Sequence, residues 1–76
     1  MKQLTQAVFN GAPDWVKSAA VDSDGTATGF SSYKSALKCR SGIWTKGDVH
    51  ASECGLGYGY DTTDWQNSAI DREVSA

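Results

Sequence analysis

Apolar residues in the first half of the chain follow a pattern that predicts two neighbouring strands. Residues 15–22 read Trp-Val-Lys-Ser-Ala-Ala-Val-Asp and place apolar side chains on both faces, so this strand should be central or covered on both sides. Residues 26–30 read as a second strand, in which threonines alternate with small residues. The Asp-Ser-Asp-Gly sequence between them predicts a hairpin turn with Gly25 in the left-handed conformation.

The middle of the chain is less regular, and two interpretations stay open for residues 31–40. They form either a helix with an apolar stripe or a loop that leads into a third strand. Ser41-Gly42 indicates a break, and residues 43–45 form a short apolar strand. After a turn at Lys-Gly-Asp, residues 49–56 are the predicted partner of that strand.

A capping signal in the last third of the chain predicts a helix. Before it, residues 55–60 alternate Gly with Leu or Tyr, which puts the large side chains of a strand on one face. Asp61 or Thr62 should then cap a helix, because their side chains accept hydrogen bonds from free backbone N–H groups. We expect two to three turns that dock through Trp65 and end near Glu73.

These elements predict an α+β fold, namely a three- or four-stranded antiparallel sheet with a short C-terminal helix packed on it. The 76 residues suffice for a single small domain, residues 1–76. A chain of this length buries a small core, to which eight aromatic residues contribute. A homodimer is a further source of buried area.

Formal charge is distributed unevenly along the chain. Residues 1–24 carry −1, residues 25–47 carry +4 and residues 48–76 carry −5, which gives the net charge of −2. The middle and the end either attract each other within the fold or form a polarised surface that meets a charged partner. The overall acidity argues against strong binding to a nucleic-acid backbone.

No residue constellation indicates a reaction, a cofactor or a metal site. Cys39, His50 and Cys54 supply three ligands, whereas a structural zinc site takes four. The turn before Thr26 lacks the spacing of an EF-hand loop. The chain has one His and no Gly-x-Ser-x-Gly motif, and residues 55–59 lack the dinucleotide-binding fingerprint. We therefore expect no enzymatic activity, no cofactor and no bound metal.

The hydrophobic runs are too short for a targeting or membrane segment. No apolar run near the start reaches seven residues, and none approaches the roughly 20 residues that span a bilayer. We expect a cytoplasmic protein that does not contact a membrane and whose two cysteines are thiols.

Residues 59–73 carry the pattern Gly-Tyr-Asp-x-x-Asp-Trp-Gln-Asn-Ser-x-Ile-x-Arg-Glu. This ending resembles that of small phage- and prophage-encoded accessory proteins of unassigned function. Val-Phe-Asn-Gly at residues 8–11, Ala-Ala-Val-Asp at 19–22 and Asp24-Gly25 are similar to the same group. The resemblance implies a phage-encoded protein in a host bacterial cytoplasm. Proteins of this size in that setting commonly bind and block a host protein, including defence nucleases.

We therefore expect a phage accessory protein that binds and inhibits or redirects a host bacterial protein. The alternatives are a nucleotide-binding protein that stacks the base on Trp and Tyr rings, or a weak nucleic-acid binder that uses residues 34–46. The candidate partner-binding residues fall into two groups. The C-terminal group is an acidic and amide surface expected to be open to solvent: Asp64, Gln66, Asn67, Asp71 and Glu73. The middle group is basic: Lys34, Lys38, Arg40 and Lys46.

Overall fold

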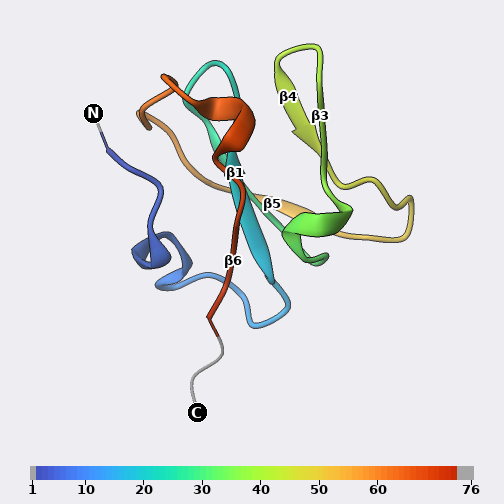
Figure 1. Cartoon of the computed structure of the whole chain (residues 1–76). Coiled ribbons are helices and arrows are strands. Elements are labelled where there is room, and N and C mark those ends of the chain that lie inside the picture. The colour runs from blue at the N-terminus through green and yellow to red at the C-terminus, as the bar shows by residue number, and fades with distance from the viewer. Residues whose placement is uncertain (1, 74–76) are drawn as a thin grey trace.

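The structure is a computed structural model that describes residues 2–73. A four-stranded antiparallel sheet has the order β5-β2-β1-β6, and a separate two-stranded hairpin pairs β3 with β4 (Figure 1). The strands are β1 (Ser18–Val21), β2 (Ala27–Phe30), β3 (Lys38–Arg40), β4 (Ile43–Thr45), β5 (Glu53–Gly57) and β6 (Ile70–Asp71). Within the described residues there are also three short 3-10 turns: η1 (Gln6–Phe9) precedes β1, η2 (Lys34–Ala36) lies between β2 and β3, and η3 (Trp65–Asn67) lies between β5 and β6.

The predicted hairpin of β1 and β2 is confirmed, and β1 is central in the sheet. All four β1 residues are buried, as expected for a strand covered on both faces. The register pairs Ala19 with Gly29 and Val21 with Ala27. Gly25 has φ +88°, and its N–H donates to the carbonyl of Asp22 at 3.0 Å, which closes the predicted turn.

The core lies on the two faces of β1, because successive strand residues point to opposite sides. Ala19 packs with Phe9 and Val16 on one face, and Ala20 packs with Phe30 and Leu37 on the other.

Gly29 allows the side chain of Leu56 to approach the backbone of β2. A Cβ at this position would lie 2.9 Å from Val16 and 3.0 Å from Leu56. The chain therefore needs a residue without a side chain at the place where β5 crosses the core.

The middle of the chain follows the loop-and-strand interpretation. Residues 31–37 form a loop with the short turn η2, and β3 follows and pairs with β4. Ser41 and Gly42 have φ of +54° and +84°, the combination that a two-residue type I′ hairpin turn requires. The predicted pairing of residues 43–45 with 49–56 is wrong, since β5 pairs with β2 instead.

The C-terminal residues do not form the predicted helix. They form one turn, η3, followed by β6, which pairs antiparallel with β1. A helix of two to three turns is marginal by itself, whereas β6 supplies hydrogen-bond partners to the edge of a buried strand. Trp65 and Ile70 nevertheless pack against core clusters, from the turn η3 and the strand β6 instead of from a helix.

The predicted one-sided strand over residues 55–60 is also wrong. β5 ends at Gly57, where φ is +141°, and Gly59 has φ +81°. The chain turns there, so Tyr60 is buried while Tyr58 is 79% exposed. No helix within the described residues 2–73 is long and apolar enough to cross a membrane.

Candidate functional site

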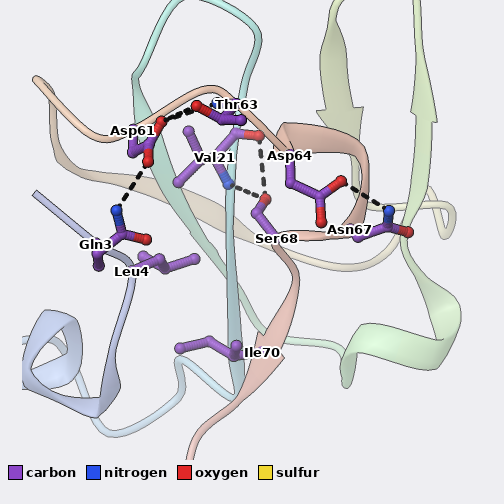
Figure 2. Close-up of a pocket in the computed structure, with 9 residues that line it drawn as sticks. All are labelled: Gln3, Leu4, Val21, Asp61, Thr63, Asp64, Asn67, Ser68 and Ile70. Atoms are coloured by element: carbon purple, nitrogen blue, oxygen red, sulfur yellow. Dashed lines mark hydrogen bonds between the residues drawn. The ribbon is translucent and has the colours of Figure 1, made fainter. Parts of the chain in front are cut away.

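A groove of about 420 Å³ lies where the N-terminal segment meets the C-terminal segment beside β1 (Figure 2). Residues from three parts of the chain line it: Gln3, Leu4, Val21, Asp61, Thr63, Asp64, Asn67, Ser68 and Ile70.

The apolar part of the groove is continuous with the core. Val21 belongs to a buried cluster, and Leu4 packs against that cluster from the N-terminal segment. Ile70, on β6, packs against the neighbouring cluster around Val16. Leu4 and Ile70 are half-buried, so they supply most of the apolar surface of the groove, while Val21 is almost fully buried.

Asp61 is held in place on the polar rim by three hydrogen bonds. Its Oδ1 accepts from the backbone N–H of Thr63 at 2.9 Å and from the Thr63 hydroxyl at 2.7 Å. Its Oδ2 accepts from Nε2 of Gln3 at 2.8 Å. The hydrogen bonds from Thr63 and Gln3 lower the pKa of Asp61 to about 2. Asp61 thus closes a local turn instead of capping a helix. The carboxylate of Asp61 stays ionised at neutral pH.

Asp64 supplies the second carboxylate of the rim. Its Oδ1 accepts from Nδ2 of Asn67 at 2.9 Å, and both residues are exposed. A lining that combines two carboxylates with apolar residues suits a ligand with a cationic end and an apolar stem, because ionised acceptors make the stronger hydrogen bonds to charged donors.

Ser68 joins the groove to the central strand. Its Oγ accepts from the N–H of Val21 at 2.8 Å and donates to the carbonyl of Trp65 at 2.7 Å. The hydroxyl thus satisfies a buried amide of β1 at a position just before the start of β6. It fixes the position of η3, and hence of Asp64, relative to the sheet.

The predicted acidic and amide residues do not form one surface. Asp64 and Asn67 line the groove, and Gln66 is exposed on the same turn. Asp71 is half-buried, and its Oδ1 accepts from the backbone N–H of Lys34 at 2.6 Å, so the expectation of a solvent-open carboxylate is wrong.

Glu73 lies apart from that groove. It lines a smaller groove of about 250 Å³ with Gln6 and Arg72. The Arg72 guanidinium donates to the carbonyl of Pro13 at 2.8 Å and lies over the Phe9 ring, which ties the two ends of the chain together.

The basic residues sit on and beside the β3–β4 hairpin. Lys34, Lys38 and Arg40 are exposed, and Lys46 is half-buried. Cross-strand pairs share a face of the hairpin, so Lys38 and Arg40 share one face with their partners Thr45 and Ile43.

The other face of the hairpin is anchored through Trp44. The Trp44 indole N–H donates to the carbonyl of Trp65 at 3.0 Å, and its backbone N–H donates to Oδ1 of Asp22 at 2.8 Å. Burial raises the pKa of Asp22, against the lowering effect of that hydrogen bond. The hairpin is therefore attached to η3, so its exposed cations have a defined position.

The cysteines and the histidine do not converge. Cys39 is exposed, Cys54 is half-buried, and neither forms a disulfide. Within residues 2–73, no group of three or more His, Cys, Asp or Glu side chains is arranged to hold a metal ion.

No family model matches the chain, and neither the curated proteins nor the solved structures include a match. The groove must therefore be interpreted from its own chemistry.

Of the nine residues that line the groove, only Asp64 and Asn67 are among the predicted binding residues. Three of the others, Gln3, Asp61 and Ser68, make the polar contacts described above. Asp-Thr-Thr at residues 61–63 is a local turn signal that could have placed Asp61 on a loop. The contacts of Gln3 and Ser68 span 58 and 47 residues of sequence, and no local pattern indicates them.

Proposed function

We propose that the protein is a binding module that holds a cationic side chain of a partner protein in the groove beside β1. The observation that carries the proposal is the groove itself, whose lining combines the carboxylates of Asp61 and Asp64 with the apolar residues Leu4, Val21 and Ile70 (Figure 2). A Lys or Arg side chain has this chemistry, because its methylene stem packs on apolar groups while its charged end binds carboxylates.

The resemblance of residues 59–73 to phage and prophage accessory proteins supports a setting for this binding. We propose that the partner is a host bacterial protein in the host cytoplasm, such as a defence factor, and that binding inhibits or redirects it. The groove-lining residues Asp61, Asp64 and Asn67 lie within the segment that carries this resemblance.

The charge of the groove argues against a catalytic role and against the binding of phosphate groups. With its pKa near 2, Asp61 is a poor general acid or base near pH 7, where catalytic groups need a pKa close to the working pH. The same two carboxylates repel an anionic nucleotide. We therefore propose a non-enzymatic role that needs no cofactor.

The β3–β4 hairpin supports a second candidate function, weak nucleic-acid binding. Lys38 and Arg40 are exposed, and Tyr33, at 53% exposure, precedes the exposed Lys34. A basic surface with an aromatic ring is the combination that binds single strands. Such binding should weaken steeply with salt, and its absence at low salt would exclude this candidate.

Stacking of a nucleotide base is the remaining alternative. Trp15 is 40% exposed, so a bound base that stacked on it should change the tryptophan emission. Unchanged fluorescence across a nucleotide panel would exclude it.

Affinity purification from bacterial lysate with three matched baits tests the proposal. The baits are the wild type, Asp64→Lys and Asp48→Lys. Asp48 is an apt control because it is also an exposed turn carboxylate, which accepts from the N–H of His50 at 2.9 Å, but it does not line the groove. We expect a bacterial protein that the wild type and Asp48→Lys enrich and that Asp64→Lys loses at least about tenfold, because reversing a buried or partly buried charge contact costs over 1.4 kcal/mol.

Two results would count against the groove. Equal enrichment by all three baits would place the contact elsewhere, and a Lys38→Glu bait that alone loses the protein would assign it to the hairpin. Circular dichroism of each bait excludes unfolding as the cause.

A further inference from the structure

β5 forms an open edge of the four-stranded sheet. It is the terminal strand in the order β5-β2-β1-β6 (Figure 1). The N–H of Ser31 donates to the carbonyl of Ser52 at 2.9 Å, and amides along an antiparallel strand alternate in direction. The backbone groups of Glu53 and Gly55 therefore point away from β2. Glu53 and Gly55 are both exposed. A Cβ built on Gly55 would meet no atom within 4 Å, so one face of the sheet is also open at this residue.

This edge lacks most of the features that prevent an edge strand from pairing with a strand of another molecule. β5 contains one charged residue, Glu53, and no proline. A bulge lies farther along, where Ala27 pairs with Gly57 and Thr28 with Gly55. The bulge leaves residues 52–55 as a regular segment. The opposite edge strand, β6, has only two residues.

We propose that β5 of one molecule pairs antiparallel with β5 of a second copy, about a two-fold axis through Cys54. In this register the outward amides meet, because Glu53 lies opposite Gly55 of the second copy and exchanges backbone hydrogen bonds with it. Neither Glu53 has a like charge directly opposite, which would be destabilising. The pairing joins two four-stranded sheets into one of eight strands.

Exposed apolar residues at both ends of β5 fit a second copy. Val49 and Tyr58 flank the strand and are 83% and 79% exposed. Antiparallel pairing brings the Val49 end of one copy toward the Tyr58 end of the other, twice in the dimer. A Tyr contributes roughly 150–250 Å², so this interface falls at the small end of specific interfaces and should be weak.

Sedimentation of the purified protein over a range of concentrations, up to millimolar, tests the proposal. We expect the average mass to rise toward twice the monomer mass. Gly55→Pro removes one outward N–H per copy and should weaken the dimer at least about tenfold. Gly55→Ala keeps that N–H and meets open space, so it should dimerise like the wild type.

A second measurement needs no variant and does not depend on whether Gly55→Pro folds. Amide hydrogen exchange of the wild type should show protection of Glu53 and Gly55 that grows with protein concentration. A protein that stays monomeric at millimolar concentration, or a dimer in which these two amides exchange as fast as in the monomer, would overturn the proposal. Both measurements use the isolated protein, so their outcome is separate from that of the groove experiment.

Discussion

Ser68 shows how one side chain can stand in for backbone pairing. The N–H of Val21 is on a fully buried strand, and the Ser68 hydroxyl is its acceptor. Ser68→Ala leaves this amide without that acceptor, and we expect a loss of about 1–3 kcal/mol in the free energy of unfolding.

Urea denaturation measures this loss. Ser35→Ala, at an exposed position of η2, is the matched control and should change stability by less than about 0.5 kcal/mol. Equal effects of the two substitutions would mean that the Ser68 hydroxyl does not support β1.

Asp61 makes the stability of the protein depend on pH in the acidic range. Its pKa in the folded protein is about 2, below the ordinary value of 3.8, so the folded state favours the carboxylate. The resulting stabilisation is present above pH 3.8 and is lost as the pH falls toward about 2. Asp61→Asn should therefore flatten the decrease in melting temperature across this window.

Asp22 provides a control of opposite sign in the same titration. Its pKa is raised, so its protonation on acidification favours the folded state. Asp22→Asn removes that gain and should steepen the decrease in melting temperature as the pH falls. Parallel melting curves for the wild type and Asp61→Asn would show that the hydrogen bonds of Asp61 do not stabilise the fold.

The β3–β4 hairpin depends on a strained residue at its turn. Ser41 has φ +54°, a left-handed conformation that asparagine adopts more readily than serine. Ser41→Asn should raise the unfolding free energy by about 0.5 kcal/mol, whereas Ser41→Val should lower it by about 1 kcal/mol or more. Thermal melts of the two variants measure the difference, and an equal melting temperature would mean that this turn does not limit the stability of the hairpin.

Local signals were sufficient for the elements whose partners are adjacent in sequence. β1, β2 and the Gly25 turn follow from apolar pattern and turn chemistry. The β3–β4 turn also carried a signal, since Ser41-Gly42 suits a two-residue hairpin loop, but it was interpreted as a break. The prediction of a C-terminal helix was wrong for another reason. Its capping residues and helical spacing are genuine local preferences, and pairing with β1 overrides them.

At the scale of the whole molecule, many of the acidic side chains are used within the fold. Five carboxylates, four in turns and loops and one on β6, accept hydrogen bonds from backbone amides: Asp22, Asp24, Asp48, Asp61 and Asp71. Asp64 and Asn67 were correctly expected to be accessible, and they line the groove. The groove could not be predicted because its walls come from both ends of the chain, and only the complete sheet brings them together.

The central proposal is that the groove beside β1 is the contact surface for a protein partner. Amide hydrogen exchange of the complex with the captured partner tests it most directly, because the method locates the contact on this chain. We expect slower exchange at residues 61–68 in the complex than in the free protein, with little change at β3 and β4. Slower exchange confined to residues 38–45, with residues 61–68 unchanged, would contradict it.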